Sequence, residues 1–404
     1  MSIVVQKYGG SSVADTNKLQ RVAERVMQTR AAGHDVVVVV SAMGNTTDEL
    51  LALAKTISPN PDRRELDMLL SAGERISMAL LSMAIRELGG QAISFTGSQS
   101  GIITNDRHVD ARIIEVRPFR VQDELARGKI VVVAGYQGVS YRREITTLGR
   151  GGSDTTAVAM AAALGAEWCE ICSDVDGIYT TDPRVVRHAW RIPVLSYEET
   201  QELAESGAKV LNAQAVEFAK ERGIAIYARS TAGPLPGEDP SSDGTVVRKF
   251  GPRLPGSVVG IASEKEMVMI QSREVDELLK VTDEFGVPGK QLHIIAIGTE
   301  QDGISMVVSK ENLHQTSNLR AALQSIPARW DDSLGAVSII GAGITASHQR
   351  VLQGSRALRE LNVHCFAIAT SSFRITWLIE RGKVDQVVQF FHQIFIENAN
   401  PAVP

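Results

Sequence analysis

The chain has 404 residues, of which 44% are hydrophobic, and its formal net charge is −5. This length predicts two or three domains with ample core. The net charge is near neutral and the sequence has no basic run of the kind that binds nucleic acid. No apolar stretch approaches the roughly 18 residues that a membrane span needs, and the amino terminus lacks a signal-peptide pattern, so we expect no membrane association. Three cysteines cannot build a disulfide framework, which favours a cytoplasmic location.

Strand-like and helix-like patterns alternate from the amino terminus to about Arg229. The valine run Val36–Val40 is apolar on both faces, as in an interior strand of a parallel sheet covered by helices. The alternation predicts an α/β domain with a mostly parallel sheet. The expected strands are Ile3–Gln6, Asp35–Ser41, Gln91–Phe95, Lys129–Ala134, Glu167–Ser173 and Ile224–Arg229, and the expected helices are Asn17–Gln28, Thr47–Ile57, Glu65–Leu88, Ser153–Leu164, Tyr197–Ala204 and Asn212–Glu221.

Two glycine-containing loops lie between strands and helices of this domain. One is Lys7-Tyr8-Gly9-Gly10-Ser11-Ser12, and the other is Gly149-Arg150-Gly151-Gly152-Ser153-Asp154. A glycine cluster that runs into a helix leaves backbone N–H groups free to bind an anion. Arg150 and Asp154 flank the second cluster with opposite charges, which suits a site that holds both ends of an amino acid. The first loop lacks the spacing of an ordinary P-loop.

Cys169 and Cys172 form a Cys-x-x-Cys pair, which invites a redox or a zinc interpretation. They lie in a predicted strand, where residues three apart face opposite sides, so the thiols cannot easily meet. No second pair exists to complete a zinc site. The acidic segment that follows does not have the spacing of an EF-hand. We therefore predict core packing for the two cysteines and no metal held by protein ligands alone.

The carboxy-terminal part of the chain differs in composition and in the order of its expected elements. Thr231–Gly244 and Gly251–Gly256 are rich in Gly and Pro and predict loops or linkers. Two units of similar order follow, as in small βαββαβ modules. The first has strands Val258–Ala262 and Met267–Ser272, helix Val275–Phe285, strands Gln291–Ile297 and Ile304–Ser309, and helix His314–Leu323. The second has strand Ala336–Gly341, helix Arg350–Leu361, strands His364–Thr370 and Arg374–Ile379, and helix Lys383–Phe391.

A dinucleotide-like string lies in the second of these units. Gly341-Ala342-Gly343-Ile344-Thr345-Ala346 follows a strand and matches Gly-x-Gly-x-x-Ala, with Glu360 further along the chain. The next helix is expected to start only near His348, so its amino end would miss a pyrophosphate. Too little chain follows for the remaining strands of a doubly wound domain. We therefore reject a dehydrogenase.

Four strings occur together in this sequence: Lys7–Val13, Ser41–Asp48, Gly149–Thr156 and Ser173–Arg184. In their order and spacing they resemble the aspartate kinases of the amino-acid kinase superfamily, and the likeness covers essentially the whole chain. The resemblance implies a three-layer αβα kinase domain over residues 1–245 and two α+β, ferredoxin-like ACT regulatory domains over residues 256–330 and 335–404. It also implies ATP-dependent phosphorylation of the side-chain carboxylate of L-aspartate, at the start of lysine (diaminopimelate), threonine and methionine biosynthesis.

The resemblance assigns site residues one by one. Lys7, Asp154 and Lys209 are the implied catalytic residues. The implied aspartate-binding residues are Ser41, Thr47, Glu74, Arg150, Gly151, Gly152, Ser153 and Asp154. The implied ATP-binding residues are Lys7, Gly9, Gly10, Ser11, Ser173, Asp174, Tyr179, Asp182, Pro183, Arg184 and Lys209. Mg²⁺ is implied by the ATP chemistry. A homodimer or a larger assembly through the ACT domains is expected, with lysine, threonine or diaminopimelate as a feedback effector.

The sequence departs from the family at two places. Asn212-Ala213-Gln214 replaces the usual His or Ser, Pro, Arg, and the first ACT unit lacks the usual Pro-Gly turn and asparagines. Two alternatives stay open beside aspartate kinase. One is a kinase of another amino-acid carboxylate, such as glutamate or N-acetylglutamate. The other is a catalytically weak or regulation-deficient relative.

Overall fold

The computed structural model describes residues 2–149, 151–208, 211–235, 239–251, 256–285, 287, 304–310, 313 and 316–399, and the backbone of residues 293–297. The chain divides into two compact units. The first contains Met1–Ile178, Arg191–Gln201 and Val210–Pro252, and the second contains Tyr179–Trp190, Glu202–Lys209 and Arg253–Pro404.

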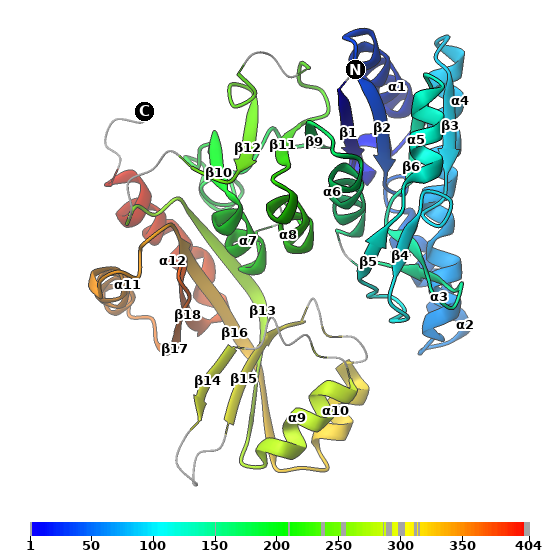
Figure 1. Cartoon of the computed structure of the whole chain (residues 1–404). Helices are drawn as coiled ribbons and strands as arrows, with labels where there is room; N and C mark the ends of the chain where they lie inside the picture. The colour runs from blue at the N-terminus through cyan, green and yellow to red at the C-terminus, as the bar shows by residue number, and fades with distance from the viewer. Residues whose placement is uncertain are drawn as a thin grey trace. The chain divides into compact units, whose positions relative to one another are not determined.

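A largely parallel sheet forms the centre of the first unit (Figure 1). Its strands are β1 (Ile3–Tyr8), β2 (Asp35–Val40), β3 (Ala92–Phe95), β6 (Ile130–Ala134), β9 (Trp168–Ser173), β10 (Val194–Ser196), β11 (Ala225–Ser230) and β12 (Gly244–Arg248). They pair in the order β10-β12-β11-β9-β1-β2-β6-β3. Only the β11–β12 pair among them is antiparallel. The predicted parallel sheet is therefore present.

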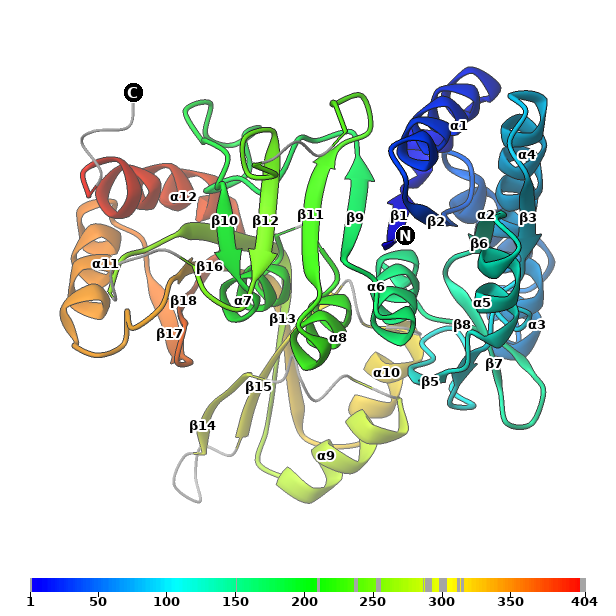
Figure 2. The same cartoon turned by 45° about the horizontal axis from the view of Figure 1, so that its top comes forward.

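Helices cover both faces of this sheet (Figure 2). From the amino terminus to β11 the helices are α1 (Thr16–Ala31), α2 (Thr46–Ile57), α3 (Arg63–Leu70), α4 (Ala72–Glu87), α5 (Phe119–Ala126), α6 (Gly152–Leu164), α7 (Tyr197–Glu205) and α8 (Ala213–Arg222). α1 and α4 share a core with alternate residues of β1 and β2, including Val4 and Val38. α6 packs on β1, β2 and β9 and contacts α8. Val36–Val40 are all buried because both faces are covered.

Two features of the first unit differ from the sequence prediction. The helix expected over Glu65–Leu88 is divided at Ser71 into α3 and α4. A small second sheet, with the order β5-β4-β7-β8, was not predicted because its strands have only three or four residues each. These strands are β4 (Ile102–Thr104), β5 (Ile113–Val116), β7 (Gln137–Ser140) and β8 (Ile145–Thr147).

The helical run Arg63–Glu87 is long and apolar enough to cross a membrane by length and composition alone. The expectation that no such stretch exists is wrong by this measure. Leu81 and Ile85 in this run are fully buried in the core shared with α1 and the sheet. A core helix of a layered domain has the same composition, so packing accounts for the apolar character of this run.

A six-stranded antiparallel sheet forms the second unit, with the order β14-β15-β13-β16-β18-β17. Its elements are β13 (Gly260–Ser272), β14 (His293–Ile297), β15 (Ile304–Ser309), β16 (Ala328–Ile340), β17 (Cys365–Thr370), β18 (Arg374–Glu380), α9 (Val275–Glu284), α10 (Thr316–Leu323), α11 (Gln349–Glu360) and α12 (Val384–His392). Separate cores lie under α9 and α10 and under α11 and α12.

The long strands β13 and β16 join the two halves of this sheet (Figure 1). Two strands were predicted at Val258–Ala262 and Met267–Ser272, but a single strand runs through both, with register shifts between Glu264 and Met269. The predicted strand at Ala336–Gly341 begins eight residues earlier, at Ala328. Charged residues interrupt the apolar pattern over the first half of β16, so the sequence did not indicate a strand there.

The segment Tyr179–Trp190 packs into the second unit, although it follows β9 in the chain. Val186 is part of the core with α11 and α12. The Thr180 hydroxyl lies 2.9 Å from Nε2 of His392, and the amide of Ile261 donates to the Thr180 carbonyl at 2.7 Å. Thr180 and His392 are both buried. The sequence analysis did not predict this packing.

The dinucleotide-like string of the second unit has no room for a pyrophosphate. α11 begins at Gln349, several residues after the glycines. A Cβ on Gly341 would stand 2.1 Å from the carbonyl oxygen of Ser257. The backbone of Ser257 therefore fills the space in front of the glycine turn, which agrees with the rejection of a dehydrogenase.

Candidate active site

Loops from neighbouring parallel strands meet at the carboxyl edge of the large sheet. The Gly9 amide donates to Cys172 O at 3.2 Å, and the Ser41 amide donates to Tyr8 O at 3.1 Å. The Gly135 amide donates to Val40 O at 2.9 Å. The ends of β1, β2, β6 and β9 are thus tied side by side. This edge is where open α/β sheets place their ligands.

Lys7 and Asp154 form the central ion pair of this edge. Lys7 Nζ is 2.6 Å from Asp154 Oδ1, and each side chain is 12% exposed. Lys7 belongs to β1 and Asp154 to the first turn of α6. Two implied catalytic residues that lie far apart in the chain are thereby brought together.

The glycine loop after β1 is closely packed. A Cβ on Gly10 would stand 2.9 Å from Ala42 O and 3.1 Å from Gly44 O, so a side chain cannot be added without moving backbone. The position of a Cβ on Gly9 lies 3.5 Å from Lys7 Nζ. Ser11 follows in the same loop, and its carbonyl accepts from Lys18 Nζ at 2.9 Å. The loop therefore keeps its backbone close to the Lys7 ammonium.

Glu74 is a buried carboxylate in the first turn of α4. It is 2% exposed, and its Oε1 accepts from the Ala42 amide at 3.0 Å. Within the described residues its Oε2 has no hydrogen-bond partner. Burial raises the pKa of Glu74 to about 7, against the opposing effect of the Ala42 hydrogen bond. An unpartnered buried oxygen beside the loop of Ser41 and Ala42 is suited to receive a cationic group.

The amino end of α6 supplies further polar groups. Gly151 is its N-cap in the left-handed region, at φ 69°, a conformation that favours glycine. A Cβ on Gly135 would stand 2.7 Å from Ser153 Oγ, so the loop after β6 lies against Ser153. Gly152 packs against Leu148 and Tyr136. The amino end of the helix, which carries the positive end of its dipole, therefore lies at the same edge as Lys7.

Asn212 occupies the place where the sequence departs from its relatives. It caps α8 by accepting from the Gln214 amide at 2.8 Å. A Cβ on Gly151 would stand 2.7 Å from Asn212 Nδ2. The substituted residue therefore lies against the α6 N-cap. The predicted residues Arg150 and Lys209 lie outside the described part of the chain.

A second set of predicted residues lies around the end of β9. Ser173 Oγ accepts from the Val175 amide at 3.2 Å, and Asp174 is exposed beside it. Thr231, which directly follows β11, was not predicted. Its hydroxyl lies 2.6 Å from Ser12 Oγ and donates to Ser173 O at 3.0 Å. Its position after a parallel strand at this edge was the signal that would have identified it.

The remaining nucleotide residues of the sequence prediction belong to the second unit. These are Tyr179, Asp182, Pro183 and Arg184. Arg184 pairs with Asp182 at 2.7 Å, and hydrogen bonding from Arg184 lowers the pKa of Asp182. The Arg184 side chain is largely exposed. The assignment of these four residues to the nucleotide stays a prediction, as does that of Thr47 in the first turn of α2.

Asp67 is another residue that sequence reasoning missed. It is fully buried in α3 and accepts from the Thr147 hydroxyl at 2.5 Å and the Val109 amide at 3.0 Å. His108 Nδ1 lies 2.5 Å from its other oxygen. Thr147 ends β8, shortly before Gly149 and the α6 loop. Asp67 therefore fixes the segment that leads into the second glycine cluster.

The two cysteines of the Cys-x-x-Cys pair are buried and unbridged. Cys172 lies in the core shared with α1, and burial raises the pKa of each thiol well above its usual value. The predicted packing is confirmed. Among the described residues, no group of three or more His, Cys, Asp or Glu side chains is placed to hold a metal ion.

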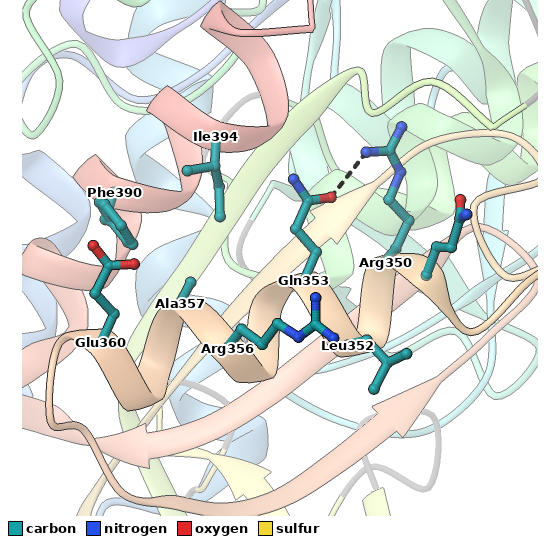
Figure 3. Close-up of a pocket in the computed structure, with 9 residues that line it drawn as sticks. Arg350, Leu352, Gln353, Arg356, Ala357, Glu360, Phe390 and Ile394 are labelled. Atoms are coloured by element: carbon teal, nitrogen blue, oxygen red, sulfur yellow. Dashed lines mark hydrogen bonds between the residues drawn. The ribbon is translucent and has the colours of Figure 1, made fainter.

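A shallow groove of about 640 Å³ lies along α11 in the second unit (Figure 3). Arg350, Gln353 and Arg356 point from α11, and Phe390 and Ile394 come from the carboxy-terminal helices. Arg350 donates to Gln353 Oε1 at 3.1 Å. None of the predicted site residues lines this groove.

Comparison with known proteins identifies the class that this fold and site define. The model of the Amino acid kinase family matches residues 2–230. The chain is 44% identical to the aspartokinase of Mycolicibacterium smegmatis, over 98% of this chain and 96% of that protein. It is 42% identical to the aspartokinase of Corynebacterium glutamicum, with the same coverage. The chain therefore belongs to the aspartokinases of the amino acid kinase family.

Solved structures agree with this membership. E. coli aspartokinase III in complex with aspartate and ADP is 25% identical, with a TM-score of 0.82, and the match covers 97% of this chain and 99% of that one. The same enzyme in complex with lysine and aspartate has a TM-score of 0.73, with coverage of 98% and 99%. The α/β fold with a carboxy-terminal antiparallel ACT sheet and the aspartate kinase activity, both predicted from the sequence, are confirmed.

Proposed function

We propose that the chain transfers the γ-phosphoryl group of ATP to the side-chain carboxylate of L-aspartate, giving ADP and 4-phospho-L-aspartate, at the site around Lys7 and Asp154. The pairing of these two residues beside the glycine loop and the amino end of α6 is the observation that carries this proposal. A side-chain carboxylate has a reference pKa of about 4, so the nucleophile is already ionised and needs no general base. The remaining obstacle is the approach of an anion to a polyanion, which positive charge and positioning overcome.

We assign a role in this reaction to each predicted site residue. Lys7 and the Gly10 amide stabilise the transferring phosphoryl group, with Gly9 and Ser11 beside them and Lys209 as a second cation. Arg150 binds the α-carboxylate of aspartate, and Glu74 and Asp154 receive its α-ammonium. Ser41, Thr47, Gly151, Gly152 and Ser153 complete the aspartate pocket. Ser173, Asp174, Tyr179, Asp182, Pro183 and Arg184 bind the ribose and the base.

Mg²⁺ would reach this site with the nucleotide. The described residues offer no cluster of metal ligands, so the phosphates of ATP are its proposed main ligands. When bound, the ion neutralises phosphate charge. The chain's own contribution is to hold the two anions in line and to exclude competing water.

The buried Glu74 favours a substrate with a free amino group. An N-acetylated amino acid has no ammonium to offer its unpartnered Oε2. We expect ADP release with L-aspartate, little with L-glutamate and none with N-acetyl-L-glutamate, when each is supplied with ATP and Mg²⁺. A hydroxylamine trap for the acyl phosphate measures the product directly. A faster rate with N-acetyl-L-glutamate would contradict the proposal, and binding of both substrates without turnover would support the catalytically weak alternative.

Gly10 provides a second test of the site. We expect Gly10→Ala to lower kcat/KM for ATP roughly 10²-fold, since its Cβ displaces the phosphate loop from the Ala42 carbonyl. Initial rates at varied ATP measure the effect. Gly382→Ala is the matched control, because a Cβ there meets nothing within 4 Å. Equal rates for the two variants would show that the loop after β1 does not bind the nucleotide.

The second unit is proposed to regulate this activity. We assign residues 256–330 and 335–404 to two ACT domains that bind lysine, threonine or diaminopimelate and associate two chains, with residues 1–245 as the kinase domain. Lysine is named with the E. coli relative, which supports an amino-acid effector. We place the enzyme in the cytoplasm, in the pathway to lysine, threonine and methionine. Initial rates with each amino acid, alone and in pairs, test the effector.

A further inference from the structure

One buried carboxylate of the first unit has no task in the proposed phosphoryl transfer. Glu170 lies in β9 and is fully buried. Its neighbours across the sheet are Gln6 on β1 and Tyr227 on β11. Gln6 Nε2 donates to its Oε2 at 2.8 Å. A buried carboxylate is stable only with compensating partners, so its other partners indicate what it does.

Arg25 of α1 is the first cationic partner. Its guanidinium is 2.7 Å from Glu170 Oε1. The same guanidinium donates to the carbonyl of Gly233 and, at 3.1 Å, to that of Pro234. The Arg25 side chain is only 7% exposed. Glu170 therefore orients an arginine whose Nη1 and Nη2 donate to the backbone of the segment that follows β11.

Arg229 of β11 is the second cationic partner. Its Nε is 3.9 Å from Glu170 Oε1, and its side chain is 2% exposed. It donates to the Pro240 carbonyl at 2.8 Å and pairs with Asp243 at 2.6 Å. Pro240 and Asp243 lie just before β12. The two arginines around one carboxylate thus hold the two described stretches, residues 231–235 and 239–243, of the connection between β11 and β12.

These two stretches, here together called the β11–β12 loop, begin beside the proposed phosphate site. Thr231 is its first residue, and the Thr231 hydroxyl joins Ser12 of the glycine loop to the end of β9 at Ser173. β11 lies next to β9 in the sheet, and β9 lies next to β1. A nucleotide whose phosphates lie at the end of β1 and whose ribose lies at the end of β9 extends toward the end of β11, where the loop begins.

We propose that Glu170 is a positioning residue for ATP, and that it acts by holding the β11–β12 loop through Arg25 and Arg229 against the nucleotide. This inference rests on the proposed function and adds a part of the site that neither glycine loop supplies. Glu170 faces α1, whereas Lys7 and Asp154 meet on the side of α6. Its loss therefore weakens nucleotide binding and leaves the aspartate pocket in place.

The test is a comparison of two affinities in the full-length chain. We expect Glu170→Gln to raise the Kd for a non-hydrolysable ATP analogue, measured by calorimetry, and the KM for ATP, each roughly tenfold or more. The KM for aspartate stays within about twofold, and kcat at saturating ATP is largely kept. A purely structural defect would move both KM values together or lower kcat alone.

Asp243→Asn separates positioning from folding. Its side chain is 24% exposed, and among the described residues it pairs with Arg229. The asparagine oxygen still accepts from the buried guanidinium, so we expect a folded variant with a slightly lower melting temperature, whose ATP affinity falls while its KM for aspartate does not change. Asp67→Asn is the matched comparator, because Asp67 holds the segment before the α6 loop. We expect it to raise the KM for aspartate instead.

Wild-type analogue affinity in both Glu170→Gln and Asp243→Asn would overturn the inference, as would equal rises of the two KM values. If Glu170→Gln does not fold, Asp243→Asn decides alone. The calorimetric measurement needs no aspartate turnover. A wild-type chain that binds the analogue but does not phosphorylate aspartate would therefore refute the proposed reaction and leave this test valid.

Discussion

Replacing Lys7 by alanine is expected to lower kcat for aspartate-dependent ADP release by roughly 10³-fold, the effect of removing one preorganised charge from developing negative charge. Lys7 is the cation that the described residues place beside both the glycine loop and the amino end of α6. Its ammonium is only partly exposed, so its attraction for phosphate is weakly screened. A coupled assay at saturating substrates measures the loss.

The loss must be separated from a folding defect. Lys7→Ala leaves Asp154 without its 2.6 Å partner, and a buried charge without a partner destabilises the fold. We expect the double variant Lys7→Ala/Asp154→Asn to regain much of the lost melting temperature while remaining inactive. Lys220→Ala is the control, since the pair that Lys220 makes with Glu198 lies at the surface. Activity of Lys7→Ala within tenfold of wild type would refute its assignment.

The apolar runs and the chain order of the loops made much of the kinase fold predictable. Val36–Val40 and Ile130–Ala134 are buried on both faces, which only a covered interior strand explains. Lys7 and Asp154 were predicted at the ends of separate loops and meet in the structure. Their meeting follows from a rule of parallel sheets, that the carboxyl ends of the strands share one edge.

The features that the sequence could not predict depend on contacts between segments far apart in the chain. β16 includes Arg329 and Asp331 because its first half pairs with β13, and no local apolar pattern reports such a partner. Thr180 lies inside the string Ser173–Arg184, which resembles the nucleotide loop, yet its hydroxyl hydrogen-bonds to His392. Glu170 lies in a predicted strand, where nothing in the local sequence marks it out. Its two arginines come from α1 and β11 and are invisible to local spacing.

Glu74→Gln is expected to raise the KM for aspartate roughly 10²-fold, because a buried carboxylate that receives an ammonium contributes a strong charge-assisted hydrogen bond. The KM for ATP should stay unchanged, since Glu74 lies beside the loop of β2 and not beside the nucleotide strands. Initial rates at varied aspartate and varied ATP give both constants. Glu87→Gln, an exposed change at the other end of α4, is the matched control and should alter neither.

The pH dependence gives the same residue a second signature. The pKa of Glu74 is raised to about 7, so in the free enzyme the carboxylate is protonated below this pH and cannot hold an ammonium. The KM for aspartate should therefore rise as the pH falls below about 7, and level off above it. In Glu74→Gln this inflection should be absent. An unchanged inflection in the variant would assign the titration to another group.

The same pKa shift means that the ionised Glu74 carboxylate destabilises the folded state. Its pKa in the folded state lies above the value of 4.5 in the unfolded chain, so its contribution to the free energy of unfolding falls as the pH rises from about 4.5 through 7. The shift corresponds to about 3 kcal/mol when complete. Denaturant unfolding should thus show Glu74→Gln to be more stable than wild type at pH 8, by about 1–2 kcal/mol once the cost of its buried amide is subtracted. That advantage should vanish by pH 5, where the wild-type carboxyl is neutral in the fold. A variant less stable than wild type at pH 8 would mean that the Glu74 carboxylate has a partner in the free enzyme and is not held open for the substrate.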